Sequence, residues 1–219
     1  EKAFYRSGLE NVFIPKAVKT IGDYAFAADG DTDYRLKSIV FEEGSQLETI
    51  GNNAFDLCRN LTIIEIPSSV TSIGDKAFYQ CDKLVNIYCY GVTPATLGSD
   101  VFKNISSNAK IYVPLSSLNE YKTQWSEYAD IIVGMSLYTE NGWDSEPTPT
   151  SLASVKSNLV IEKNEMLNVA SIVISDNASV IVKDGGQLAC NDVTGNVIVE
   201  KEIEGYADQD ENCWYTIAS

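Results

Sequence analysis

Histidine is absent from all 219 residues of the chain. The sequence therefore lacks the commonest general base in proteins and the imidazole group that binds most zinc ions. This absence excludes Ser-His-Asp and Cys-His catalysis together with histidine-based metal sites. It leaves open an enzyme that works through paired carboxylates, as glycosidases do.

Basic residues are scarce, with 16 Lys+Arg against 31 Asp+Glu and a net charge of −15. From Met135 onward the count is 4 Lys against 14 Asp+Glu, so the acidity is concentrated in the second part of the chain. A polyanion repels phosphate backbones and anionic lipid surfaces. We therefore expect no nucleic acid partner.

Long apolar runs are also missing, and the longest, such as 131–133, contain only a few residues. A membrane-spanning helix needs about 20 apolar residues, so we expect no membrane insertion by this chain. The chain starts at Glu1 without a charged and apolar leader, which suggests a removed leader or an excised fragment. With 44% hydrophobic and 21% charged residues, the composition is that of a folded protein.

The sequence contains an internal repeat of twenty-odd residues. An Ala-Phe pair marks each copy, with a Val-Phe variant in the last: Ala3-Phe4, Ala25-Phe26, Ala54-Phe55, Ala77-Phe78 and Val101-Phe102. An Ile-Gly step, or Leu-Gly in the last copy, precedes the later pairs at a constant offset: Ile21-Gly22, Ile50-Gly51, Ile73-Gly74 and Leu97-Gly98. Apolar residues at spacing +3 and +5 lie between these motifs, as in Leu61, Ile64 and Ile66.

This spacing predicts a short strand in each repeat, because residues two apart share one face of a strand. Asp or Asn follows the Ile-Gly step, as at Asp75, and predicts a helix N-cap before a helical turn that buries Phe78. One such unit cannot cover its own apolar face, whereas stacked copies form a continuous core. The sequence therefore predicts a repeat solenoid.

The run 66–84, Ile-Pro-Ser-Ser-Val-Thr-Ser-Ile-Gly-Asp-Lys-Ala-Phe-Tyr-Gln-Cys-Asp-Lys-Leu, resembles the repeat of BspA-like leucine-rich repeat proteins. The resemblance covers about residues 1–134. It implies a right-handed leucine-rich-repeat solenoid with a short strand and a helical turn per repeat. It also implies an extracellular or cell-surface protein of a bacterium, in which repeats serve adhesion or ligand binding without catalysis.

The repeat pattern ends after Pro114, and residues 117–125 predict an amphipathic helix that caps the last rung. We place the solenoid and its cap at residues 1–134 and a linker rich in Pro, Ser and Thr at 135–157. Residues 158–219 carry short alternating apolar runs and predict a small all-β domain. Their short, even spacing favours parallel β-helix rungs over a sandwich. This part resembles the β-rich C-terminal regions of Bacteroides-type surface proteins.

Five cysteines are spread along the chain without a CxxC motif. Cys58 and Cys81 take the same place in consecutive repeats, three residues after the phenylalanine. A disulfide between them would require Cα atoms about 4.4–6.8 Å apart. Free buried thiols are the alternative that we favour, because cysteine packs well as a small apolar residue.

The outward face of the predicted strands is the candidate binding surface. Its column reads Phe13, Val40, Glu65, Tyr88 and Tyr112, with Tyr90 beside it. Tyrosine suits contacts with protein or glycan, so we name Phe13, Tyr88, Tyr90 and Tyr112 as candidate ligand-binding residues. Aromatic residues also occur in strands for packing alone, and this explanation stays open.

Asp29, Asp31 and Asp33 alternate as in the first part of a calcium loop. An EF-hand fails here, because Tyr34 stands where that loop needs Gly and Val40 where it needs Glu. A looser Ca²⁺ site and an ordinary acidic surface loop remain as alternatives. We expect no other cofactor.

Three functions are compatible with this sequence. We favour a non-enzymatic binding or adhesion protein whose strand face binds a host or bacterial surface protein or a glycan. A carboxylate glycosidase without histidine is the second, although the sequence has no pocket signature. A structural stalk segment of a larger surface protein is the third.

Overall fold

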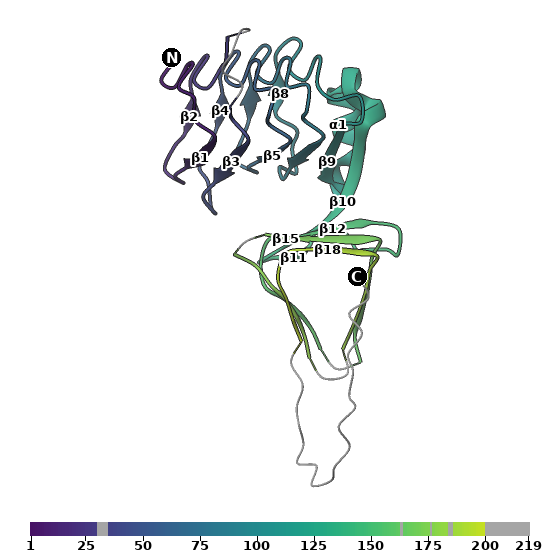
Figure 1. The fold of residues 1–219 in the computed structure, drawn as a ribbon. Coiled ribbons are helices and arrows are strands. Elements are labelled where there is room, and N and C mark those ends of the chain that lie inside the picture. Colours follow the sequence, from purple (N-terminus) through teal and green to yellow (C-terminus); the bar gives the residue numbers. More distant parts are fainter. Residues whose placement is uncertain (30–34, 163, 176, 184–185, 200–219) are drawn as a thin grey trace. The chain divides into compact units, whose positions relative to one another are not determined.

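The computed structural model describes residues 1–219 except 30–34, 163, 176, 184–185 and 200–219 (Figure 1). The chain divides into two compact units, Glu1–Gly134 and Met135–Ser219. We call them the N-terminal unit and the C-terminal unit and describe each by itself.

The N-terminal unit is built from parallel strands that recur once per repeat. The longer strands are β1 (Asn11–Ile14), β3 (Ser38–Phe41), β5 (Ile63–Ile66), β7 (Asn86–Cys89) and β9 (Lys110–Pro114). Strand β1 pairs with β3, and β5, β7 and β9 pair in that order. Two-residue strands form a second parallel sheet: β2 (Thr20–Ile21), β4 (Thr49–Ile50), β6 (Ser72–Ile73) and β8 (Thr96–Leu97).

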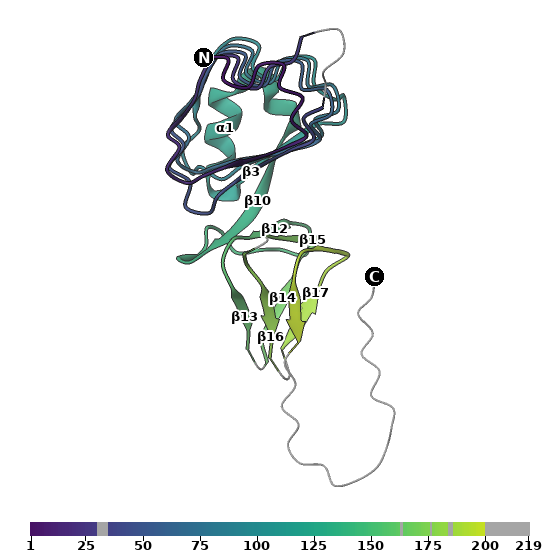
Figure 2. The ribbon, with the colours of Figure 1, turned by 60° about the vertical axis from the view of Figure 1, so that its left-hand side comes forward.

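The repeats stack in register, so equivalent residues lie above one another. Ile64 pairs with Ile87, and Ile87 pairs with Ile111, and all of these side chains are buried. The rungs nearly superpose in the view of Figure 2. The predicted leucine-rich-repeat solenoid is confirmed, because each rung buries its apolar face against the next.

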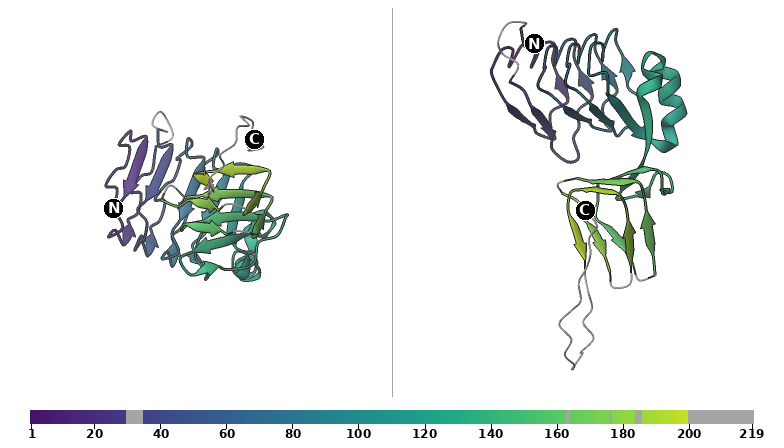
Figure 3. Two further views of the ribbon diagram at one scale, coloured as in Figure 1. Left: turned by 90° about the horizontal axis from the view of Figure 1, so that it is seen from below. Right: turned by 45° about the vertical axis from the view of Figure 1, so that its right-hand side comes forward.

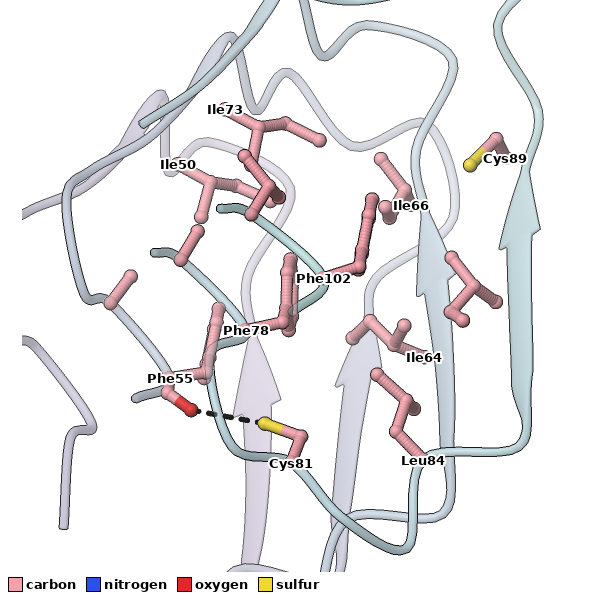
Figure 4. Packing of buried hydrophobic residues seen from close by; sticks show 14 of the residues in the cluster. Ile50, Phe55, Ile64, Ile66, Ile73, Phe78, Cys81, Leu84, Cys89 and Phe102 are labelled. Atoms are coloured by element: carbon pink, nitrogen blue, oxygen red, sulfur yellow. Dashed lines mark hydrogen bonds between the residues drawn. The ribbon is translucent and has the colours of Figure 1, made fainter. Parts of the chain in front are cut away.

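The marker phenylalanines form one stacked column through the core. The ring centroids of Phe4, Phe26, Phe55, Phe78 and Phe102 lie 5.2, 5.4, 5.1 and 5.4 Å apart in that order, with interplanar angles of at most 13°. Figure 4 shows part of this column beside the buried isoleucines. The backbone follows the same order, since the Phe55 N–H donates to the Ala77 carbonyl at 2.8 Å.

The segments around the phenylalanines are tight turns, which corrects the predicted helical turn. Lys76, directly after the expected N-cap Asp75, has a φ of 54°, and Gln80 has a φ of 56°. A left-handed residue cannot continue a right-handed helix, so the chain turns instead.

The Asp and Asn side chains after the Ile-Gly steps bind the next repeat. Asp23 Oδ1 accepts from the Asn52 N–H at 2.8 Å, Asn52 Oδ1 from the Asp75 N–H at 2.8 Å, and Asp75 Oδ1 from the Ser99 N–H at 2.7 Å. We call this series the Asx ladder. It explains the glycine in the later motifs, because a Cβ on Gly74 would lie 2.6 Å from Asn52 Oδ1 and 2.7 Å from Asn52 N.

A helical segment covers the last rung of the solenoid. It consists of η1 (Leu115–Ser117), α1 (Leu118–Gln124) and η2 (Ser126–Ile131). Tyr121 Oη donates to the Gly91 carbonyl at 2.8 Å, and Trp125 Nε1 donates to the Ala95 carbonyl at 2.8 Å. Both side chains are buried. The segment thus provides hydrogen-bond donors for two backbone carbonyls and also shields the apolar side chains of the last rung from water.

The cysteines of the described residues are free thiols. Cys58 Sγ lies 3.4 Å from the Phe26 carbonyl oxygen, and Cys81 Sγ lies 3.2 Å from the Phe55 carbonyl oxygen (Figure 4). Burial raises the pKa of both thiols, so each stays protonated and donates a hydrogen bond to the preceding repeat. Cys89 is also buried.

The C-terminal unit is built from three series of parallel strands (Figure 3). The pairing orders are β10-β12-β15-β18, β13-β16-β19 and β14-β17, with the hairpin strand β11 on β10. The bounds are β10 (Ile132–Thr139), β11 (Gly142–Trp143), β12 (Leu152–Val155), β13 (Leu159–Ile161), β14 (Met166–Asn168), β15 (Ser171–Ile174), β16 (Val180–Val182), β17 (Gln187–Ala189), β18 (Asp192–Thr194) and β19 (Val197–Val199).

Residues 135–157 are not the linker that the sequence predicted. They include most of β10 and all of β11 and β12, and β12 pairs with β10 on one side and β15 on the other. Ala153 and Val155 are buried in the core of the C-terminal unit. The Pro- and Ser-rich stretch 144–151 lies between strands, so the composition that suggested a linker marks a loop.

Candidate ligand-binding face of the solenoid

The outward side chains of the longer strands form the candidate face. Alternation turns the second and fourth residues of each strand inward, as Ile64 and Ile66 show, and the first and third outward. The third residues include Phe13, opposite Val40 in the β1–β3 pair. The same column continues as Glu65, Tyr88 and Tyr112 in β5, β7 and β9.

The rings of Tyr88, Tyr90 and Tyr112 lie close together on this face. The Tyr88 ring centroid lies 4.9 Å from that of Tyr112 and 6.5 Å from that of Tyr90, with interplanar angles of 17° and 7°. Tyr88 is only 9% exposed, and the other two are half-buried. Because Tyr88 is nearly buried, little of its ring is open for stacking a ligand.

The electrostatics of Tyr88 agree with this packing. Burial, the neighbouring Tyr112 and the carboxylate of Glu65 together raise the pKa of Tyr88 to about 12. All three effects disfavour a phenolate, and burial is the largest. Tyr88 is therefore a neutral hydroxyl at physiological pH, able to form hydrogen bonds but not to act as a base.

The exposed apolar residues of this face lie on the first three longer strands. Phe13 on β1 is 60% exposed, Val40 on β3 48% and Ile63 on β5 45%. We call Phe13, Val40 and Ile63 the apolar strip. Sequence reasoning named Phe13 as a candidate but missed Ile63, although strand alternation already turned Ile63 outward.

The predicted calcium residues are placed only in part. Asp29 forms an ion pair with Arg6, with the Nε–Oδ2 distance at 2.8 Å. Asp31 and Asp33 lie outside the described residues. Within the described ranges, no group of three or more His, Cys, Asp or Glu side chains is arranged to hold a metal ion.

Among the described residues, no helix combines the length and the apolar character that crossing a membrane requires.

The stacked repeats and their outward strand face define a leucine-rich-repeat solenoid. The model of the BspA type Leucine rich repeat region matches residues 1–124 with 6 copies. That match covers more than half of the chain. The chain therefore belongs to the BspA-type leucine-rich repeat family.

A search of solved structures finds a leucine rich cell surface protein from Faecalibacterium prausnitzii A2-165, known from a crystal structure. It is 18% identical in sequence, with a TM-score of 0.34, and the similarity covers 85% of this chain and 60% of that chain. This chain thus matches 60% of the length of that protein. No curated protein matches the sequence.

Proposed function

We propose that this chain is a non-catalytic binding module on the surface of a bacterium, and that its strand face binds a protein partner. The observation that carries the proposal is the apolar strip, whose three side chains are 45–60% exposed on successive strands. Apolar groups gathered on a rigid surface are a frequent mark of protein–protein contact. Membership of a family of surface-protein repeats supports the same role.

A protein partner fits this face better than a glycan. Sugar rings stack on open aromatic faces, whereas Tyr88 is only 9% exposed and its ring lies 4.9 Å from that of Tyr112. The apolar strip offers aliphatic and aromatic surface to an apolar patch of similar kind. The tyrosine cluster lies further along the same face, where its hydroxyl groups supply polar contacts at the edge of such an interface.

The residues of the strand face give little support to a glycosidase. Hydrolysis by carboxylates needs two of them about 5–9.5 Å apart on either side of the scissile bond. Among the first and third residues of β1, β3, β5, β7 and β9, Glu65 is the only carboxylate. A single carboxylate on an open face cannot act as both acid and base.

The double substitution Val40→Ser and Ile63→Ser tests the proposal. The wild-type protein is applied to an array of purified extracellular matrix proteins and to a glycan array, beside a glycan hydrolysis screen. We expect a protein signal that the double variant weakens at least tenfold, with an unchanged melting temperature, because both side chains are exposed.

The variant Asn86→Ser with Lys110→Ser is the matched control, since it changes outward residues of β7 and β9 and leaves the apolar strip intact. Hydrolysis in the screen would contradict the non-catalytic role. Protein binding that survives the loss of Val40 and Ile63 would refute the strand face as the binding surface.

A further inference from the structure

The ladder of longer strands is interrupted inside the solenoid, between β3 and β5. Among the described strands, β1 pairs with β3, and β5 continues through β7 to β9, but no pairing joins β3 to β5. At 2.7–2.9 Å, the first bond of each other ladder joins Lys37 N–H to Glu10 O, Val85 N–H to Thr62 O and Lys110 N–H to Val85 O. Within the described residues, the Thr62 N–H makes no such bond to Lys37.

Pro67 removes the bond that would close this ladder at its other end. The Glu42 N–H donates to the Ile14 carbonyl at 2.9 Å at the end of the β1–β3 pair, and the Tyr90 N–H donates to the Ile66 carbonyl at 3.1 Å at the end of the β5–β7 pair. Pro67 is the equivalent residue after β5, and proline has no N–H to donate to β3. The β3–β5 junction therefore lacks the bond at each end.

The connection that follows β3 is also longer than its neighbours. It covers residues 42–48, whereas residues 15–19 join β1 to β2 and residues 67–71 join β5 to β6. Connections of equal length allow successive strands to lie in register. The longer connection removes that constraint at the end of β3.

The same two rungs are joined on their other sides. Strand β4 pairs with β6, where Ile50 lies opposite Ile73, and the Gly74 N–H donates to the Ile50 carbonyl at 2.8 Å. The ring centroids of Phe55 and Phe78 lie 5.1 Å apart. The two rungs are thus attached along the short strands and the phenylalanine turns, and no ladder attaches them along the strand face.

Two exposed apolar side chains of the strand face lie on the two sides of this interruption. Val40 on β3 is 48% exposed and Ile63 on β5 is 45% exposed. Tyr88, whose strand is paired on both sides, is only 9% exposed. The interruption therefore divides the apolar strip, with Phe13 and Val40 on one side and Ile63 on the other.

We propose that the β3–β5 junction is a hinge of the strand face, at which the two strands separate and approach while β4, β6 and the phenylalanine turns hold the rungs together. Motion concentrates where few bonds must break, and this junction has the fewest on the face. The motion changes the distance between Val40 and Ile63. A consequence rests on the proposed function: a partner that contacts both side chains fixes the hinge in one position.

Amide hydrogen exchange, followed residue by residue by NMR, tests the missing ladder. The Thr62 and Ile66 carbonyls accept from β7, so the backbone groups of Ile64 also point to β7 and those of Ile63 point to β3. We expect the Ile63 amide to exchange at least a hundredfold faster than the Ile64 amide. Strand β7, which is paired on both sides, is the control and should show no such alternation.

A repair variant tests the cause of the interruption. Pro67→Glu combined with deletion of Glu43 and Gly44 restores a donor and gives the connection the length of its neighbours. We expect this variant to slow the exchange of the Ile63 amide at least tenfold. Glu43→Ala, an exposed change that keeps the length of the connection, is the matched control and should leave the exchange unchanged.

Relaxation dispersion NMR on the free protein tests the motion itself. We expect dispersion at the amides of β3 and β5 and none at those of β7 and β9. The disulfide variant Val40→Cys with Glu65→Cys, which holds the Cα atoms about 4.4–6.8 Å apart, should abolish it. Equal exchange of Ile63 and Ile64, or flat dispersion in β3 and β5, overturns the hinge. Neither measurement uses a partner, so failure of the hinge and failure of the binding role are distinguishable.

Discussion

The carboxyl group of Asp56 is a partly buried polar group in one turn of the solenoid. Asp56 follows Phe55 in a turn, and its Oδ1 atom is buried without a hydrogen-bond partner among the described residues. Burial is the main reason that the pKa of Asp56 rises to about 6, while Lys76 and the backbone N–H of Leu57 act in the opposite direction. The charged form is therefore the unfavourable one in the fold.

Asp56→Asn should stabilise the protein at neutral pH. The folded state holds the Asp56 proton more tightly than the unfolded state, whose pKa is the ordinary 3.8. The stabilising contribution of Asp56 is thus present below about pH 4 and is lost as pH rises through about 6. With solvent screening of a half-buried group, we expect a gain of about 1 kcal/mol in the free energy of unfolding at pH 7.5.

Urea unfolding at pH 7.5 and 4.5 measures this gain, which should shrink at the lower pH. Asp130→Asn, an exposed residue in η2, is the control and should show no such dependence. A difference between Asp56→Asn and wild type that stays constant with pH would contradict the assignment.

Each turn of the solenoid is held by the Asx ladder of the neighbouring repeat. The side chain of Asn52 accepts from the Asp75 N–H and lies directly against Gly74. Helix capping uses the same residue types for a bond within one chain segment, but here the bond joins two repeats. The ladder therefore couples neighbouring rungs directly after the short strands β4 and β6.

Gly74→Ala tests the close approach in this ladder. The new Cβ would lie within 2.7 Å of both Asn52 Oδ1 and Asn52 N, and the backbone atom cannot swing away. We expect a loss of about 2–3 kcal/mol in the free energy of unfolding, as for other overpacked sites. Thr62→Ala, an exposed change, is the control in the same urea titration. A loss of less than about 0.5 kcal/mol would show that Asn52 moves away from the new methyl group at little cost.

The N-terminal unit as a whole is a stack whose two ends differ. The phenylalanine column runs from Phe4, exposed at the first rung, to Phe102, which contacts Trp125 and Tyr128 of the capping segment. In a solenoid each repeat is stabilised by its neighbours, so residues at an uncovered end have fewer partners.

Position in the stack should decide the cost of losing a phenylalanine. Phe55→Ala removes a fully buried ring between two neighbours, and we expect it to cost about 3–5 kcal/mol. Phe4→Ala removes a half-exposed ring with one neighbour and should cost about 1 kcal/mol. Urea unfolding of both variants provides the comparison. Equal losses would contradict the difference in burial between the two rings.

The repeat and its stacking could be predicted from the sequence alone. The spacing of Phe55 and Phe78 and the alternation in Ile64 and Ile66 specify which side chains must be buried, because burial follows periodicity. The outward direction of Phe13 and of Tyr88 followed from the same alternation. The spacing within one repeat determined these features, because every repeat buries its apolar side chains against the next repeat in the same way.

Other features depended on contacts between repeats, which no local pattern specifies. Asp75 stands where the sequence predicts a helix N-cap, yet its Oδ1 atom accepts a hydrogen bond from the Ser99 N–H in the next repeat. The alternation predicted an outward Tyr88, but in the structure neighbouring side chains leave it only 9% exposed. Spacing along the chain thus set which side chains face inward, and stacking in space decided which surfaces remained open, because exposure depends on neighbours distant in sequence.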